Sequence, residues 1–264
     1  MIAIIGAGKM GEALLAGMLN TGHDPADVLV TEPRADHAAE LRARYAVRVV
    51  PAAEAARQAS TLIIALKPQD MVALLDDLAP ALRPDCLVVS VAAGITTEVL
   101  EKHLNPDTAV VRAMPNTPAL VGLGMTAVAG GRHARDEHLE RAESLLSSVG
   151  EVVRVPEKYM DTVTALSGSG PAYFYFIAET MIEAGVLMGM PRATAEKLVT
   201  QTITGAAAML RDSGEHPVVL REAVSSPGGT TAAAVRELER HGVRTAFTDA
   251  IEAARDRSRQ LSEG

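Results

Sequence analysis

The chain has 264 residues, 48% of them hydrophobic and 22% charged, with a formal charge of −8 at pH 7. This length allows one large or two modest domains with a real core, and the composition excludes wholesale disorder. The acidic charge and the 3% aromatic content argue against a nucleic-acid-binding protein, which needs a basic surface and rings that stack on bases. The single cysteine, Cys86, excludes an internal disulfide and is expected in the buried core.

Neither the first residues nor the least polar region of the chain is typical of a membrane protein. The first residues form a short apolar run without a basic segment before it, which is not typical of a signal peptide. The least polar region, 162–191, is interrupted by Glu179 and Glu183, and a bilayer would not accommodate these charges. We therefore expect a soluble cytoplasmic protein.

In chain order, the first half alternates short apolar runs with stretches of helical spacing. Strands are predicted at 1–5, 28–31, 47–49, 61–66, 86–91 and 108–114, and helices at 9–21, 35–45, 52–59, 69–82 and 97–103. Strands without polar alternation are buried on both faces, as in a parallel sheet covered by helices. Two further strands, 125–130 and 151–155, with a helix over 136–149, are expected at the far edge of the same sheet.

The second half is predicted to be helical throughout. Its expected helices are 157–166, 171–188, 192–213, 217–224, 230–241 and 243–261. The predicted fold class is therefore α/β: an N-terminal Rossmann-type doubly wound sheet, residues 1–155, followed by an all-α C-terminal domain, residues 156–264. The helix 171–188 is apolar nearly all round, so we expect it to meet a second subunit; the alternative is a central helix of a monomer.

A complete G-x-G-x-x-G motif, Gly6-Ala7-Gly8-Lys9-Met10-Gly11, follows the first strand and opens the first helix. In this context Gly6 permits a tight turn, Gly8 lets the backbone approach a pyrophosphate, and Gly11 lets helix and strand pack closely. The amides at the helix start would face the phosphates. An ordinary glycine turn is the alternative, but the position of the motif favours dinucleotide binding.

Two charged residues after the second strand bear on which dinucleotide binds. Glu32 stands where an acidic residue would hold the ribose 2′-hydroxyl of an NAD-type cofactor. Arg34 could instead bind the 2′-phosphate of an NADP-type cofactor. The two signals conflict, so the sequence leaves the preference between NADPH and NADH open.

Other loops at the carboxyl ends of the predicted strands also line the expected ligand crevice. Leu66, Lys67 and Pro68 follow the fourth strand, and Lys67 is a candidate contact for cofactor phosphate or ribose. Ala93 follows the fifth strand and is small enough to let a nicotinamide ring lie close. Asn116, between two prolines, offers a side-chain amide in a stiff loop after the sixth strand.

Two segments rich in glycine and hydroxyl groups precede helices in the second half: residues 167–171, SGSGP, and residues 225–231, SSPGGTT. Backbone amides at a helix start, together with hydroxyls, make a site for a carboxylate. Simple helix capping is the alternative reading of each. The seven histidines show no metal-ligand spacing, and no metal site is expected. Because no His–Asp pair emerges as a base, reduction of a C=N bond is favoured over oxidation of an alcohol.

Seven motifs in this order make the chain resemble pyrroline-5-carboxylate reductases from about residue 1 to residue 261: IGAGKMG, ALKPQ, VVSVAAGIT, RAMPNTPALVGLG, TALSGSGPAYFYF, VSSPGGTTAAAVRELE and EAARDRSRQL. The resemblance implies reduction of (S)-1-pyrroline-5-carboxylate to L-proline with NAD(P)H, the last step of proline biosynthesis. It also implies a helical domain that interleaves with a second subunit in a homodimer, with dimers assembling into a decamer of five dimers.

The resemblance further implies roles for particular residues. Gly6 to Gly11, Lys67 and Ala93 would contact the cofactor, NADPH or NADH. The pocket for the substrate carboxylate and ring nitrogen would be formed by Ser226, Gly228, Gly229, Thr230 and Thr231. Thr231 would bond the nitrogen and is the candidate for proton delivery, directly or through water.

Two other interpretations remain. The β-hydroxyacid dehydrogenase family shares the glycine turn and the helical second domain, but its members carry a catalytic K-x-x-N motif on a C-terminal helix. In this chain Lys197 is followed by Thr200 in place of Asn. A non-catalytic dinucleotide sensor would need the glycine turn but not the hydroxyl-rich segments.

Overall fold

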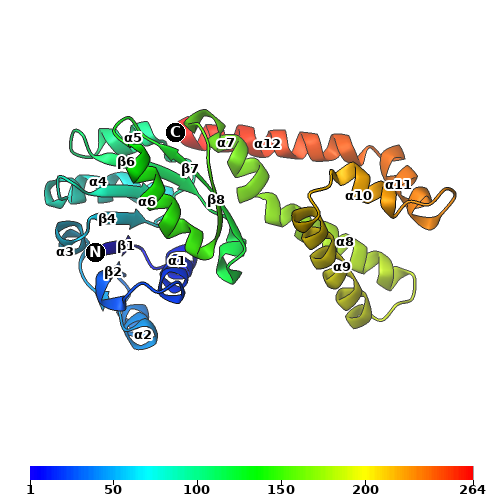
Figure 1. Ribbon diagram of the computed structural model, residues 1–264, viewed down its shortest axis with the longest axis horizontal. Helices are drawn as coiled ribbons and strands as arrows, with labels where there is room; N and C mark the ends of the chain where they lie inside the picture. Colours follow the sequence, from blue (N-terminus) through cyan, green and yellow to red (C-terminus); the bar gives the residue numbers. More distant parts are fainter. Residues whose placement is uncertain (264) are drawn as a thin grey trace. The chain divides into compact units, whose positions relative to one another are not determined.

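The computed structural model describes residues 1–263, and side chains to residue 262. Within this range one sheet has the strand order β3-β2-β1-β4-β5-β6-β7-β8 (Figure 1). The strands are β1 (Ile2–Ile5), β2 (Val28–Thr31), β3 (Arg48–Val49), β4 (Thr61–Ile64), β5 (Leu87–Ser90), β6 (Ala109–Met114), β7 (Gly124–Gly130) and β8 (Gly150–Arg154). All eight lie where the sequence predicts strands.

The α-helices also follow the predicted order. They are α1 (Lys9–Asn20), α2 (Ala35–Tyr45), α3 (Ala52–Gln58), α4 (Met71–Leu78), α5 (Thr97–Lys102), α6 (Asp136–Leu146), α7 (Met160–Val163), α8 (Gly170–Leu187), α9 (Arg192–Asp212), α10 (Pro217–Ala223), α11 (Thr230–Arg240) and α12 (Val243–Glu263). Shorter turns are η1 (Pro25–Asp27), η2 (Pro68–Asp70), η3 (Ala79–Ala81), η4 (Thr117–Val121), η5 (Ser147–Val149), η6 (Glu157–Tyr159) and the π-helical η7 (Thr164–Gly168).

The sheet is parallel from β3 to β6 and reverses at β7. β7 pairs antiparallel with β6, and β8 pairs parallel with β7. A parallel connection needs a crossover of a dozen or more residues. Only residues 115–123, with the short turn η4, join β6 to β7, so the chain can return only in the opposite direction. The expected far edge of the sheet is therefore present and runs against the first six strands.

Side chains of successive strand residues point to opposite faces of the sheet and join two apolar layers. Ile4 packs in the layer with Leu14 of α1, where α2 and α6 also contribute. Ile5 packs in the other layer with Leu75 of α4, together with α3 and α5. Cys86 is 2% exposed in this second layer, as expected, and its burial raises the pKa of the thiol to about 12. The helices on both faces confirm the doubly wound arrangement.

The chain forms two compact units. The first joins Met1–Ser169 with the residues from Ala254 on, and the second is Gly170–Ala253. The proposed domain boundary at 155–156 coincides with the end of the sheet. The first unit nevertheless keeps residues 156–169 and the end of α12, because Ser258 Oγ donates a hydrogen bond of 2.8 Å to Asp161 Oδ1.

The second unit buries little of its apolar surface within one chain. On α8 the side chains of Phe174 and Phe176 are 61% and 68% exposed, and Gly170 is the helix's one buried residue. On α9, Ala195 and Val199 are buried. The alternative of α8 as a central helix of a monomer does not fit these exposures, whereas the expected contact with a second subunit does. None of the described helices is both long and apolar enough to cross a membrane.

An ion pair between a buried arginine and a half-buried glutamate joins the sheet to the segment that follows it. Arg112 on β6 is 3% exposed, and its Nη1 donates to Glu157 Oε1 at 2.9 Å. The same oxygen accepts the backbone N–H of Thr97 at the start of α5. Arg112 Nη2 and Glu157 Oε2 have no hydrogen-bond partner among the described residues, so the pair depends on this single charged contact.

We expect Glu157→Gln to lower the free energy of unfolding by about 2–4 kcal/mol, because it leaves the Arg112 guanidinium buried without a countercharge. Urea unfolding followed by circular dichroism measures this change. Glu54→Gln is the matched control, since Glu54 pairs with Arg48 at the surface and such pairs contribute about 1 kcal/mol or less. Equal effects of the two substitutions would contradict the role of the Arg112–Glu157 pair.

Candidate active site

The turn from β1 to α1 is built around missing side chains. Gly6 has φ +94°, and a Cβ there would lie 2.5 Å from Leu66 Cδ2 and 2.8 Å from the Ala65 carbonyl oxygen. A Cβ on Gly11 would collide with the carbonyl oxygen of Gly6. These two glycines are therefore required by the fold itself, as the motif predicts.

Gly8 differs from the other two glycines of the motif. Its backbone is extended, with φ −69°, and a Cβ there would meet no protein atom within 4 Å. It is also the N-cap of α1, where no side chain caps the helix. The N-terminus of α1 thus has open space beside Gly8 and carries the positive end of the helix dipole, a fit for the pyrophosphate of a dinucleotide.

The other predicted cofactor residues gather at the same edge of the sheet, because each follows a parallel strand. Leu66 is half-buried beside Gly6, whereas Lys67 and Pro68 are exposed after β4. Ala93 is exposed after β5. The structure therefore brings these residues to the carboxyl edge together with the glycine turn, where doubly wound sheets bind ligands.

Glu32 and Arg34 form one unit after β2. Glu32 Oε1 accepts hydrogen bonds of 2.9 Å from both the backbone N–H and Nε of Arg34, and Oε2 accepts one of 3.2 Å from Nη2. The Glu32 side chain is 4% exposed beneath an Arg34 side chain that is 67% exposed. These hydrogen bonds from Arg34 lower the pKa of Glu32 against the opposing effect of burial. Glu32 and Arg34, which indicate different cofactors in the sequence, thus form one hydrogen-bonded ion pair, and part of the Arg34 guanidinium still faces solvent.

The amide of Asn116 is occupied by the protein. Its Nδ2 donates to the Ser167 carbonyl oxygen at 3.2 Å and to Ser167 Oγ at 3.3 Å, and its Oδ1 accepts the N–H of Met125 at 2.8 Å. These bonds fix the loop after β6 to η7 and to β7. Asn116 therefore has a structural role, and its contact with cofactor stays a prediction.

The SGSGP segment is not an open helix start. Ser167 and Gly168 belong to the π-helical turn η7, which runs on into α8, and the N–H of Ser169 is bonded to the Thr164 carbonyl oxygen at 2.8 Å. A Cβ on Gly168 would lie 2.6 Å from Met114 Cε. The expectation of an open helix start at this segment is thus wrong, since its backbone is inside a helix and its glycine allows close packing; a role of the segment in substrate binding stays a prediction.

The SSPGGTT segment does open a helix. Gly229 is the N-cap of α11, no side chain caps this helix, and Gly228 has φ +70°. A Cβ on Gly229 would collide with Ser226 Oγ, so the turn is tight. Thr230 is exposed and Thr231 half-buried, and neither hydroxyl has a hydrogen-bond partner among the described residues. Open amides and free hydroxyls here suit a carboxylate.

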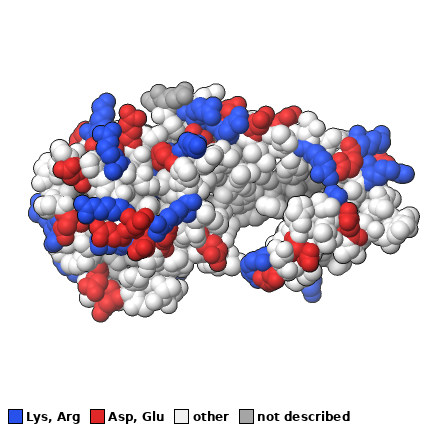
Figure 2. All heavy atoms as spheres, turned by 45° about the horizontal axis from the view of Figure 1, so that its top comes forward, with Lys and Arg blue, Asp and Glu red and all other residues white. Residues whose placement is uncertain are grey.

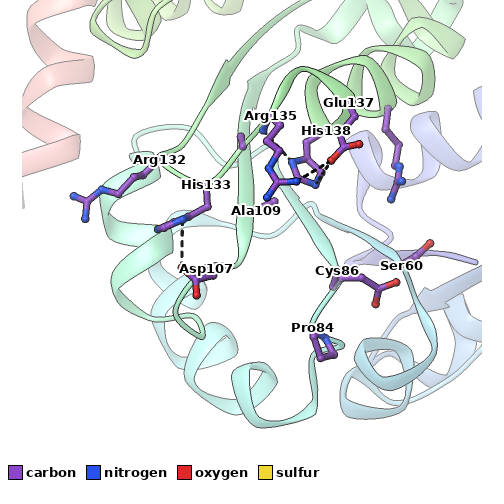
Figure 3. Close-up of a pocket in the computed structure, with 13 residues that line it drawn as sticks. Ser60, Pro84, Cys86, Asp107, Ala109, Arg132, His133, Arg135, Glu137 and His138 are labelled. Carbon is purple, nitrogen blue, oxygen red and sulfur yellow. Dashed lines mark hydrogen bonds and ion pairs between the residues drawn. The ribbon is translucent and has the colours of Figure 1, made fainter.

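A larger hollow lies at the opposite edge of the sheet. It measures about 820 Å³ and is lined by residues before β4, β5 and β6 and by the start of α6 (Figure 3). Several of its charged side chains pair with one another. His133 Nδ1 lies 3.5 Å from Asp107 Oδ1, and Arg135 Nη1 lies 3.6 Å from Glu137 Oε1. No predicted site residue lines it, and the amino ends of parallel strands are not where such folds bind dinucleotides.

Sequence reasoning missed His37, which the structure joins to the glycine turn. His37 is in the first turn of α2, and its Nε2 lies 2.8 Å from the carbonyl oxygen of Ala7. Its place one helical turn after Arg34 is the one sequence signal that could have indicated it. On the visible face in Figure 2, Lys and Arg side chains are interspersed with Asp and Glu. Recognition of a charged ligand would therefore depend on a local cluster such as this one and not on a broad electrostatic field of one sign.

Family models match both halves of the chain. Residues 157–261 match "Pyrroline-5-carboxylate reductase dimerisation", and residues 1–94 match "NADP oxidoreductase coenzyme F420-dependent". The first match supports a dimer formed through the helical region, in accord with its exposed apolar helix α8.

Relatives of known name match the chain over nearly its full length. The pyrroline-5-carboxylate reductase of Corynebacterium melassecola is 44% identical and covers 99% of this chain and 98% of its own. Among solved structures, the reductase of Coxiella burnetii has a TM-score of 0.94 at 35% identity, covering 99% and 98% of the two chains. The pyrroline carboxylate reductase of Plasmodium falciparum, with NADP bound, has a TM-score of 0.88 at 29% identity, covering 99% and 97%.

Gly8 has open space beside it and Gly11 does not, so alanine substitutions at these two positions should have opposite effects on binding and on stability. Gly8→Ala should leave the free energy of unfolding within about 0.5 kcal/mol of its original value but weaken dinucleotide binding tenfold or more, on the order of 1.4 kcal/mol. Gly11→Ala should destabilise the fold by about 1–3 kcal/mol, because its Cβ meets the Gly6 carbonyl. Cofactor titration and urea unfolding of both variants measure these effects; an unchanged affinity of the Gly8 variant would exclude the pyrophosphate from this turn.

Proposed function

The chain belongs to the pyrroline-5-carboxylate reductase family, and on that basis we propose that it reduces (S)-1-pyrroline-5-carboxylate to L-proline with NADPH or NADH, the last step of proline biosynthesis. The observation that carries this function is the match to reductases of that name over 99% of the chain. The open amides of α1 and of α11 supply the two kinds of site that the reaction needs, one for a dinucleotide and one for a carboxylate.

The first unit holds the cofactor. The amides after Gly8 bind the pyrophosphate, and Gly6 and Gly11 keep the turn close to the sheet. Lys67 contacts phosphate or ribose, and Ala93 leaves room for the nicotinamide ring. When bound, NAD(P)H supplies the hydride that adds to the carbon of the C=N bond.

The second unit holds the substrate. The amides at the start of α11, with the hydroxyls of Ser226 and Thr230, bind the substrate carboxylate. Thr231 Oγ1 bonds the ring nitrogen and delivers the proton that this nitrogen gains, directly or through water, as the C=N electron pair moves onto it; solvent water restores the proton of the hydroxyl. These residues act mainly by positioning and by fixed dipoles, so no separate strong base is required.

The two other candidate functions have less support. The position of Thr200 on α9, where a β-hydroxyacid dehydrogenase would have Asn, leaves that reaction without its motif. A non-catalytic sensor would not need the hydroxyl-rich start of α11. The reductase accounts for both units.

We propose that the enzyme is a homodimer and acts in the cytoplasm. The dimer accounts for the apolar surface of α8, which one chain leaves exposed. Further assembly into a decamer of five dimers is proposed from the resemblance to the family.

We expect Thr231→Ala to lower turnover on the order of a hundredfold while cofactor affinity stays unchanged, because only the bond to the ring nitrogen is lost. Turnover is measured by oxidation of NADPH and of NADH, in parallel, with 1-pyrroline-5-carboxylate. Thr248→Ala is the matched control, since its hydroxyl bonds only the Arg244 carbonyl oxygen. Full turnover of the Thr231 variant would exclude its role, and no turnover of the unaltered protein would exclude the function.

Light scattering on a sizing column tests the assembly. With 27.7 kDa per chain, a dimer has a mass of about 55 kDa and a decamer about 277 kDa. We expect no monomer at micromolar concentration, because association removes the large apolar side chains of α8 from water. A stable monomer would contradict the proposed interface, and a dimer alone would contradict the decamer.

A further inference from the structure

Both ring nitrogens of His37 face hydrogen-bond acceptors. Nε2 lies 2.8 Å from the Ala7 carbonyl oxygen, and Nδ1 lies 3.2 Å from Glu40 Oε2. A neutral imidazole carries one N–H and could satisfy only one of these acceptors. The doubly donating, positively charged form satisfies both, and accordingly the bond to Ala7 and that to Glu40 raise the pKa of His37.

His37 belongs to a charged cluster beside the ribose end of the cofactor site. Glu12 Oε2 of α1 lies 4.0 Å from His37 Nε2, while Glu12 Oε1 accepts 3.0 Å hydrogen bonds from Arg44 Nη1 and from the Tyr45 hydroxyl. Glu32 and Arg34 also interact electrostatically with His37. The groups that face the ring therefore come from the end of β2, from α1 and from α2.

The charge of this cluster depends on one proton. Its three carboxylates are Glu12, Glu32 and Glu40, and its two guanidinium groups are Arg34 and Arg44. With His37 neutral the cluster carries one net negative charge, and with His37 protonated it carries none. A 2′-phosphate brings close to two more negative charges, whereas a 2′-hydroxyl brings none. Protonation of His37 should therefore strengthen the binding of NADPH and hardly change the binding of NADH.

We propose that His37 is a specificity-determining residue whose protonated form admits the 2′-phosphate of NADPH, so that the preference for NADPH over NADH falls as the pH rises. This inference rests on the proposed function only in that the chain binds these dinucleotides. Arg34 supplies the exposed donors to the phosphate, and His37 cancels the excess charge that Glu40 and Glu32 would otherwise present to it.

The test is direct binding, without substrate. The fluorescence of the reduced nicotinamide gives the dissociation constants of NADPH and NADH between about pH 7 and pH 9, where the 2′-phosphate stays dianionic because it titrates near pH 6. For the unaltered protein we expect the NADPH constant to rise about tenfold relative to the NADH constant over this range. His37→Gln, which keeps a neutral donor for Ala7, should bind NADH normally and show a ratio that no longer changes with pH.

A second variant leaves His37 in place. Glu40→Gln removes the carboxylate at Nδ1, so the change in the ratio should move to lower pH, a shift that a merely structural histidine would not produce. His103→Gln is the matched control: His103 pairs with Asp76 at 2.9 Å and is 25% exposed, against 20% for His37. A constant ratio in the unaltered protein, or the same pH dependence in the His37 variant, would overturn the proposal. Turnover of 1-pyrroline-5-carboxylate is measured separately, so its absence would bear on the function and not on this inference.

Discussion

The first unit depends on the approach of the α1 backbone to the β1 turn at Gly6 and Gly11. With no side chain at either position, helix and strand come close enough for the Gly6 carbonyl to occupy the space of a Cβ on residue 11. That closeness aims the first amides of α1 past the end of the sheet and leaves the space above Gly8 open. The cofactor edge, the pairing of Glu32 with Arg34 and the contact of His37 with Ala7 are all arranged around this turn.

Patterns with a local cause could be predicted from the sequence. The apolar runs of β1, β2, β4, β5 and β6 mark buried strands because a strand covered on both faces has no reason to alternate. The glycine turn is equally local, since Gly6 and Gly11 each meet a steric demand of neighbouring residues. The amino terminus of α11 could be predicted because Gly228 and Gly229 cannot continue a helix easily, and Gly229 is its N-cap.

What the sequence could not supply were partnerships between distant residues. Asn116 has the same amide whether it faces a cofactor or Ser167, and 51 positions separate these two residues. SGSGP has the composition of a loop, yet the packing of Gly168 against Met114 draws it into a helical turn. His37 is one histidine of seven until the fold places Ala7 beside it. In each case tertiary contact, rather than propensity, decides the role.

The exposed apolar surface of α8 also makes folding of the second unit a matter of concentration. A helical unit that buries mainly Ala195, Val199 and Gly170 within its own chain has too little core to hold a unique structure alone. Its free energy of folding therefore includes the free energy of association and falls as the protein is diluted. The doubly wound unit has its own two apolar layers and carries no such dependence. On dilution, the helical unit with the α11 site therefore loses order, whereas the dinucleotide-binding unit keeps its fold.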